Sequence, residues 1–251
     1  MDLLNRSAQE YQKPKYIRFD PIAIPHGFDD PLDIEIIGLF AALLAWGQRK
    51  TTLSKLEDLC TRMHYSPANF VNTFDDNKAK MLGGFKHRTF NSDDAVWICR
   101  NLSSLYTYHG SIESLFRSSI SEDDTNIGAG IEALSKFLSQ QPQTPLRLSK
   151  HLARPSKNSA CKRLCMFARW MVRRGSFDLG VWEGIRTDQL VIPLDVHTGR
   201  QARKLGLLRR KTNDWQAALE LTTICKQIDP VDPVRFDFAL FGIGAYAEKD
   251  T

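Results

Sequence analysis

The chain has 251 residues, 42% of them hydrophobic, which is enough to bury one core or two lobes that share an interface. No apolar run approaches the roughly 20 residues that span a bilayer, and the first residues lack the pattern of a secretion signal. The five cysteines include no CxxC pair, so neither a disulfide framework nor a four-thiolate metal site is indicated. We therefore expect a cytoplasmic monomer without a membrane segment, a metal ion or a cofactor.

Positive charge is concentrated in one part of the chain. The net charge is only +5, yet residues 154–211 contain fourteen Lys or Arg and four Asp or Glu. This local excess of ten positive charges is twice the net charge of the whole chain, so the remainder is acidic overall. Such asymmetry indicates a polyanionic partner, with nucleic acid as the first candidate, although a solvated basic surface would carry the same charges.

The hydrophobic periodicity predicts an all-α protein. Apolar residues recur at i, i+3 and i+4, whereas strict alternation over a strand length is scarce. The main predicted helices cover residues 3–12, 31–46, 50–63, 92–108, 127–140, 160–172, 196–208, 215–228 and 234–247. Residues 16–30 and 81–91 are predicted to be irregular. We expect a single helical domain over residues 1–251, with the option of two lobes, one of residues 1–50 and 212–251, the other of residues 51–211.

Two polar residues stand out in the basic stretch. Lys162 lies at the edge of the core-facing stripe of a predicted amphipathic helix, on the same side as Arg169 and Arg173. Partial desolvation and neighbouring cations raise the fraction of free amine of a lysine, which a lysine nucleophile requires. Asp195 follows Pro193 and Leu194 and is the predicted N-cap of the next helix. Taken alone, these two residues would be an ordinary surface lysine and a helix cap.

Further candidates for DNA contact lie outside the basic stretch. Gln48 follows a glycine at the junction of two predicted helices, where its amide would protrude. Lys86 and Arg88 belong to a basic loop between two phenylalanines, which suits phosphate or base contact, although the phenylalanines could simply anchor the loop. The apolar walls of a base pocket would come from Trp46, Met166 and Phe241, with Phe85 and Phe238 as further options.

Two segments resemble a known superfamily. The block KRLCMFARW at residues 162–170, followed by LDVHTGR at residues 194–200, resembles the catalytic core of the helix-hairpin-helix DNA glycosylases, the archaeal-type 8-oxoguanine DNA glycosylases and endonuclease III-like proteins among them. The segment AALLAWGQRKTT at residues 41–52 is similar to the helix end that carries their gap-filling glutamine. The resemblance implies a two-lobed helical bundle with Lys162 as nucleophile, Asp195 as its carboxylate partner and Gln48 as that glutamine. His197 and Arg200 match the positions that follow the aspartate.

Other positions depart from the superfamily. Residues 156–160 read SKNSA where its members have a glycine-rich hairpin whose backbone amides bind a DNA phosphate, and Lys157 could take over this contact. Asp195 follows Lys162 by 33 positions, more than in endonuclease III. The cysteine quartet for an iron–sulfur cluster is missing, so no cluster is expected. Nearly the whole chain also resembles an uncharacterised bacterial family, which implies no activity.

The resemblance implies base-excision repair of double-stranded DNA by a glycosylase with AP lyase activity, an oxidised purine being one option for the damaged base. Lys162 would attack C1′ of a flipped-out nucleotide and form a Schiff base, while Asp195 would stabilise positive charge on the sugar. DNA would be contacted by Gln48, Lys157, Arg169, Arg173, His197, Arg200, Lys86 and Arg88. Two alternatives remain, a non-catalytic DNA-binding protein of the same fold and an unrelated helical phosphohydrolase. The scattered histidines, without an HExxH motif, disfavour the second.

Overall fold

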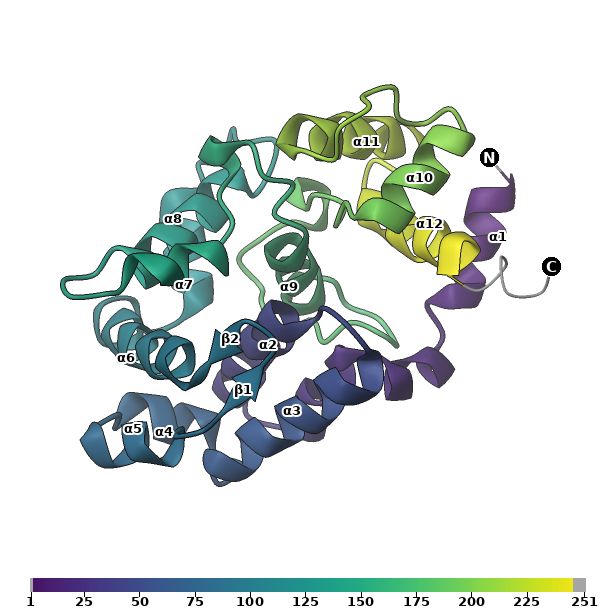
Figure 1. Ribbon diagram of the computed structural model, residues 1–251. Helices are drawn as coiled ribbons and strands as arrows, with labels where there is room; N and C mark the ends of the chain where they lie inside the picture. Colours follow the sequence, from purple (N-terminus) through teal and green to yellow (C-terminus); the bar gives the residue numbers. More distant parts are fainter. Residues whose placement is uncertain (1, 246–251) are drawn as a thin grey trace.

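The computed structural model describes residues 2–245, and its helices confirm the prediction of an all-α fold (Figure 1). The α-helices of these residues are α1 (Asp2–Tyr11), α2 (Pro31–Leu44), α3 (Arg49–Arg62), α4 (Pro67–Asn72), α5 (Asp76–Met81), α6 (Ser92–His109), α7 (Ile112–Ser119), α8 (Gly128–Ser139), α9 (Lys162–Val172), α10 (Val196–Lys204), α11 (Trp215–Ile228) and α12 (Phe236–Ala245). The predicted last helix extends to residue 247, so its final two positions lie outside the described residues.

The segments predicted to be irregular contain short regular elements. Residues 14–27 form three 3-10 helices, η1 (Pro14–Phe19), η2 (Pro21–Ala23) and η3 (Pro25–Gly27). Each begins at a proline, whose fixed φ starts a helix, but the prolines follow one another too closely for an α-helix to develop. Within residues 81–91, β1 (Lys86–His87) pairs with β2 (Phe90–Asn91) as an antiparallel hairpin. Four more 3-10 helices follow, η4 (Leu146–Lys150), η5 (Pro155–Lys157), η6 (Thr187–Gln189) and η7 (Pro233–Arg235).

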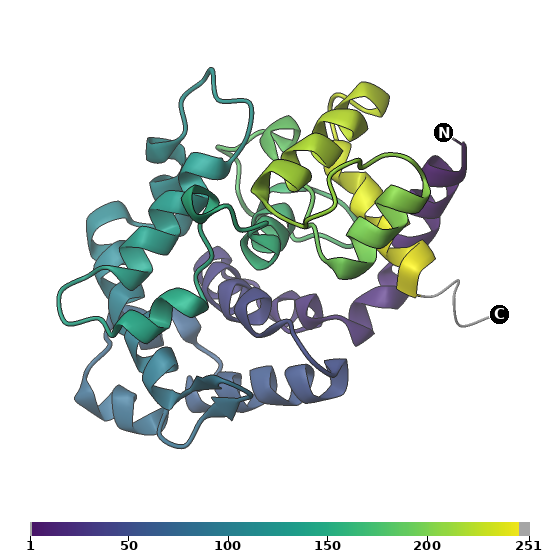
Figure 2. The same ribbon diagram turned by 45° about the horizontal axis from the view of Figure 1, so that its top comes forward.

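Helix α2 forms the centre of the core. Asp30 caps it by accepting a hydrogen bond from the Leu32 amide at 2.7 Å, and Pro31 occupies its first position. From Ile34 to Leu44 every residue of α2 is buried. Helix α9 packs against it, and both views place α9 between α2 and the group of α10, α11 and α12 (Figure 1 and Figure 2). Because α9 is enclosed in this way, all its residues from Leu164 to Val172 are buried, and its first turn is the part that reaches the surface.

The two ends of the described chain pack against each other. Helix α1 lies along α12, and α12 also packs on α10, so three segments distant in sequence meet beside the start of α9 (Figure 1). The approach of α1 and α12 depends on Gly242, because a Cβ atom there would lie 2.0 Å from Cδ2 of Tyr11. This pairing brings aromatic side chains from the N-terminus to the face of α9 that carries Lys162.

Candidate active site

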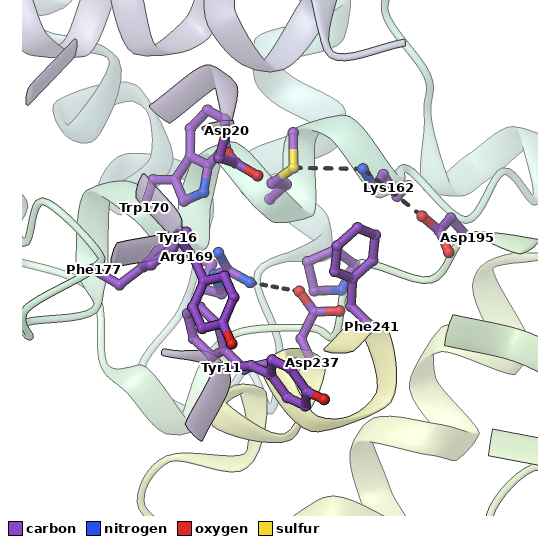
Figure 3. A pocket seen from close by; sticks show the side chains of 13 residues that line it. Tyr11, Tyr16, Asp20, Lys162, Arg169, Trp170, Phe177, Asp195, Asp237 and Phe241 are labelled. Atoms are coloured by element: carbon purple, nitrogen blue, oxygen red, sulfur yellow. Dashed lines mark hydrogen bonds and ion pairs between the residues drawn. The ribbon is translucent and has the colours of Figure 1, made fainter. Parts of the chain in front are cut away.

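Lys162 and Asp195, 33 positions apart in the sequence, meet at the edge of a pocket. The Lys162 Nζ lies 4.0 Å from Oδ2 of Asp195 and 3.5 Å from the Met166 sulfur (Figure 3). Lys162 is the first residue of α9, and its side chain is 27% exposed, so the amine is both partly enclosed and reachable from solvent. An amine beside a carboxylate at a pocket edge can act as a nucleophile whose proton has a nearby acceptor.

Asp195 has a separate role for each carboxylate oxygen. Its Oδ1 accepts a hydrogen bond from the Thr198 amide at 2.9 Å and so caps α10, as predicted. Its backbone carbonyl accepts a hydrogen bond from the Asn213 side chain, which holds this turn from the other side. The cap leaves Oδ2 directed towards Lys162. The cap geometry therefore sets the position of the carboxylate relative to the lysine.

The pocket between these residues and the chain ends has aromatic walls and acidic groups. Its empty space is about 610 Å³ when the solvent at its mouth is counted. The lining side chains are Tyr11, Tyr16, Asp20, Lys162, Met166, Arg169, Trp170, Phe177, Pro193, Asp195, Asp237, Phe238 and Phe241. They come from α1, η1, α9 and α12 and from the connecting segments at residues 20, 177 and 193–195, and the side chains labelled in Figure 3 face a common space. Trp170 is fully buried, and its Nε1–H has no acceptor among the described residues.

Asp237 places a second carboxylate in the pocket. It is an ion-pair partner of Arg169, and burial raises the pKa of Asp237 to about 6, a rise that Arg169 opposes and Asp195 reinforces. A carboxyl group with this pKa is mostly an acceptor at neutral pH and gains a proton in mildly acidic solution. The pocket thus holds carboxylates on two sides, Asp195 at its edge and Asp237 deeper inside.

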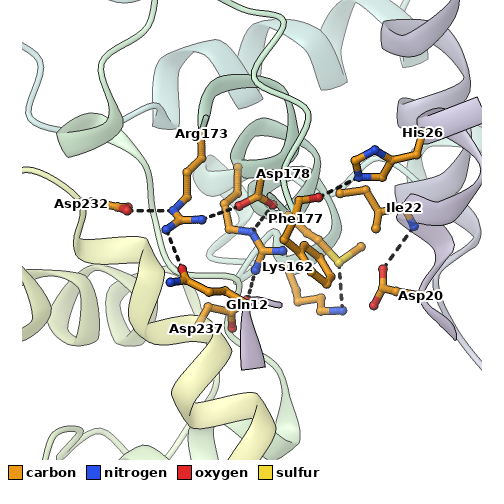
Figure 4. Close-up of polar contacts among 12 residues, drawn as sticks. Gln12, Asp20, Ile22, His26, Lys162, Arg173, Phe177, Asp178, Asp232 and Asp237 are labelled. Carbon is orange, nitrogen blue, oxygen red and sulfur yellow. Dashed lines mark hydrogen bonds and ion pairs between the residues drawn. The ribbon is translucent and has the colours of Figure 1, made fainter. Parts of the chain in front are cut away.

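Arg169 and Arg173 lie in the interior, which corrects the prediction that they contact DNA. Arg169 is 4% exposed and forms ion pairs with Asp178 and Asp237. Arg173 is 8% exposed and forms ion pairs with Asp178 at 3.0 Å and with Asp232 at 2.8 Å (Figure 4). The prediction assumed an amphipathic helix with a solvated cationic face. Helix α9 is instead surrounded, and internal carboxylates neutralise both guanidinium groups.

The proposed pocket walls are correct in part. Met166 and Phe241 line the pocket, as does Phe238. Trp46 does not: its ring meets His87 edge to face at 5.7 Å between ring centres, and the Arg88 guanidinium lies 5.0 Å from the ring centre. Its assignment to the base pocket is therefore wrong, because the β1–β2 hairpin covers it. Phe85 does not line the pocket either: it is buried in the core, with 6.2 Å between its ring centre and that of Phe90.

The remaining candidates for DNA contact lie at the surface. Gln48 is exposed at the start of α3, and its side chain makes no capping hydrogen bond. Lys86 and Arg88 are exposed on the hairpin, and Lys157 is exposed at the end of η5. His197 and Arg200 are exposed on α10, within two turns of Asp195. Their contact with DNA stays a prediction.

Sequence reasoning missed a group of pocket residues that only chain packing brings together. They are Tyr11, Tyr16, Asp20, Trp170, Phe177 and Asp237. Tyr11 and Tyr16 precede the first long apolar helix by many residues, and no local pattern connects them with α9. An unusual feature that could have drawn attention is the pair of acidic residues, Asp20 and Asp237, each beside aromatic residues in the sequence.

The described residues show neither a metal-binding cluster nor a membrane-crossing helix. Among residues 2–245, His, Cys, Asp and Glu side chains form no group of three that could hold a metal ion. None of the helices in the same range combines the length and apolarity that crossing a membrane requires.

Comparison with known proteins relates the chain to one family. The model of a family described as protein of unknown function, DUF2400, matches residues 20–246. No curated protein and no solved structure matches the chain. Lys162 and Asp195 lie inside the matched range, whereas Tyr11 and Tyr16 precede it.

Proposed function

The chain belongs to the DUF2400 family, whose description assigns no function, and we therefore propose one from the geometry of its own pocket. We propose that the protein is a DNA glycosylase with AP lyase activity that removes a damaged base. The observation that carries this proposal is the Lys162 amine, 4.0 Å from the Asp195 carboxylate at the edge of an aromatic pocket. The resemblance of residues 162–170 and 194–200 to the catalytic core of helix-hairpin-helix glycosylases supports the same assignment.

In the proposed reaction, a nucleotide is rotated out of the duplex because C1′ is inaccessible within the base stack. The Lys162 nitrogen bonds to C1′ as the bond from C1′ to the base breaks, and the base leaves with the bonding electrons and takes up a proton. Asp195 stabilises the positive charge that develops on the sugar and accepts a proton from the amine. The adduct opens to a Schiff base, and loss of a C2′ proton then expels the 3′ phosphate by β-elimination.

The pocket walls support a purine as the leaving base. Aromatic rings such as Phe241 and Phe238 offer faces for stacking. Asp20 and Asp237 offer hydrogen-bond acceptors. An oxidised purine presents N–H donors, which would bond to these carboxylates.

Exposed polar and basic residues are suited to hold the duplex. In the proposal, Gln48 enters the space that the flipped nucleotide leaves, and Lys157, His197, Arg200, Lys86 and Arg88 contact the backbone. Arg169 and Arg173 are excluded from this set because they are buried.

Borohydride trapping tests the proposal. Short duplexes with an abasic site, 8-oxoguanine or thymine glycol are incubated with the protein and borohydride, which reduces a Schiff base to a stable covalent adduct. We expect an adduct with the wild type, none with Lys162→Gln, and an unchanged yield with Lys136→Gln. Lys136 is the matched control, since it is an exposed lysine on α8, paired with Glu132.

The outcomes separate the alternatives. An equal adduct in Lys162→Gln would reject Lys162 as the nucleophile. Salt-dependent DNA binding without an adduct on any lesion would indicate the non-catalytic DNA-binding protein instead.

A further inference from the structure

A second hollow adjoins the pocket on the side of the N-terminal segment. It is lined by Lys15, Tyr16, Arg18, Phe19, Arg49, Lys50 and Leu53, which belong to η1 and the start of α3. We call it the η1–α3 groove. Its empty space is about 1230 Å³ when open solvent is counted, roughly twice that of the pocket. Four of its seven lining residues are Lys or Arg and none is acidic, so the groove is basic although it lies outside residues 154–211.

The groove contains an aromatic ring at the surface. Phe19 is 50% exposed, and the Arg18 guanidinium carbon lies 4.4 Å from its ring centre. The Lys15 amine nitrogen lies 4.9 Å from the ring centre of Tyr16, and the same amine forms an ion pair with Glu10. Exposed rings between cations are typical of surfaces that bind single-stranded nucleic acid, where bases stack on the rings and phosphates meet the cations.

The groove lies beside the pocket. Tyr16 lines both hollows. Arg49 of the groove lies over Phe241 of the pocket, with 5.4 Å between the guanidinium carbon and the ring centre. A polymer with one unit in the pocket would therefore have neighbouring units near the groove. This proximity favours a nucleic acid strand over a lipid surface, because a lipid surface offers anionic groups but no unit that enters the pocket.

We propose that the η1–α3 groove binds the DNA strand next to the flipped nucleotide, with cations on its phosphates and Phe19 stacked on an unpaired base. The base must be unpaired because both faces of a base inside a duplex are already covered by its neighbours. The inference rests on the proposed function for its DNA partner. It adds a substrate preference: a strand that is single-stranded or locally unpaired beside the lesion binds more tightly than a fully paired one.

Fluorescence anisotropy with unmodified DNA tests the groove, and all variants are made in the Lys162→Gln protein so that chemistry plays no part. The probes are labelled oligothymidine of about twelve nucleotides, within the site size of such grooves, and a duplex of the same length. We expect Phe19→Ala to weaken oligothymidine binding about tenfold, as removal of one stacking ring does, and to change duplex binding much less. The double variant Arg18→Gln, Lys50→Gln should reduce the slope of log affinity against log salt by about 0.7 for each phosphate that the protein no longer neutralises.

Tyr108→Ala is the matched control, because Tyr108 is 77% exposed on α6 and does not line the groove. Unchanged oligothymidine affinity in Phe19→Ala would overturn the inference, as would equal weakening by Tyr108→Ala. Loss of binding to anionic lipid vesicles in Phe19→Ala, with DNA affinity intact, would assign the groove to a membrane surface and also overturn it.

The two proposals fail separately. If the groove variants weaken strand binding but no lesion gives a borohydride adduct, the glycosylase proposal is refuted and the groove proposal stands. An adduct with the wild type, together with unchanged strand binding by the groove variants, would refute the groove alone.

Discussion

At the scale of single residues, the position of Asp195 follows from an ordinary helix cap. One carboxylate oxygen accepts a hydrogen bond from the Thr198 amide. This hydrogen bond fixes the side chain so that the other oxygen lies 4.0 Å from the Lys162 amine. The lysine in turn is held at the first position of α9, next to the Met166 sulfur. Two common local interactions thus place an amine and a carboxylate together, and mutation can separate the capping role of Asp195 from its charge.

Replacing Asp195 by asparagine should separate the cap from the charge. Asparagine is as good an N-cap as aspartate, so we expect the free energy of unfolding of Asp195→Asn to change by less than about 0.5 kcal/mol. The yield of borohydride adduct should fall strongly, because the sugar cation loses its stabilising carboxylate. Asp195→Ala should lose about 1 kcal/mol of stability as well. Urea unfolding and trapping measure the two effects, and full trapping by Asp195→Asn would leave Asp195 as a cap alone.

At the scale of helices, the pocket depends on how closely α1 approaches α12. Gly242 faces the Tyr11 ring, and a Cβ atom on residue 242 would come within 2.5 Å of three ring atoms. Tyr11 also lines the pocket, 5.6 Å from Tyr16 between ring centres. The contact between the two helices therefore shapes one wall of the candidate active site.

Gly242→Ala should loosen this helix pair and move Tyr11. Within a helix, alanine is more stable than glycine by up to about 1 kcal/mol. The clash at residue 242, however, involves ring atoms close to the Cβ of Tyr11, and overpacking of this kind costs about 1–3 kcal/mol. We expect a net loss of stability in urea unfolding and reduced trapping. Gly27→Ala is the control, because a Cβ atom at residue 27 would meet no atom within 4 Å. Equal stability of the two variants would show that α1 adjusts without strain.

At the scale of the whole molecule, a buried ion network joins three parts of the chain. Arg173 pairs with Asp178 in the segment after α9 and with Asp232 before α12, and it donates a hydrogen bond to Gln12 at the end of α1 (Figure 4). Arg169 links the same Asp178 to Asp237 of α12. The network borders the pocket through Arg169 and Asp237 and connects the segments around α1 and α12 to α9.

Arg173→Gln should therefore destabilise the molecule far more than the same change one residue later. Removing Arg173 takes one of two cationic partners from the buried Asp178 and breaks the ion pair of the partly buried Asp232. We therefore expect a cost near the lower end of the roughly 3–5 kcal/mol that breaking a buried ion pair costs. Arg174 is 70% exposed and pairs with an exposed Glu183, so Arg174→Gln should change the midpoint of urea unfolding little. Similar midpoints for the two variants would contradict the network's role. A weakening of DNA binding by Arg173→Gln at full stability would restore its assignment to the DNA surface.

The amino-acid sequence alone predicts the helical class and most helix starts correctly, because hydrophobic periodicity and capping signals act over a few residues. Asp30 with Pro31 begins α2, and Asp195 caps α10, as predicted. The meeting of Lys162 with Asp195 was implied by the resemblance of two short segments and not by any local pattern. The predicted cationic face of α9 was wrong because the fraction of a helix that is covered depends on how many other helices pack around it.

Which cations remain at the surface and which aromatic rings form the pocket depends on how the helices pack. Lys162 stays accessible while Arg169, seven residues later, is enclosed. The difference comes from the packing of α2 on α9 and from the ion pairs of Arg169 with Asp178 and Asp237. Tyr11 and Phe241 line one pocket although they belong to opposite ends of the chain. Hydrophobic periodicity and capping residues depend on positions that are close in the sequence. Burial and pocket shape depend on helices that are distant in the sequence and pack together to exclude water.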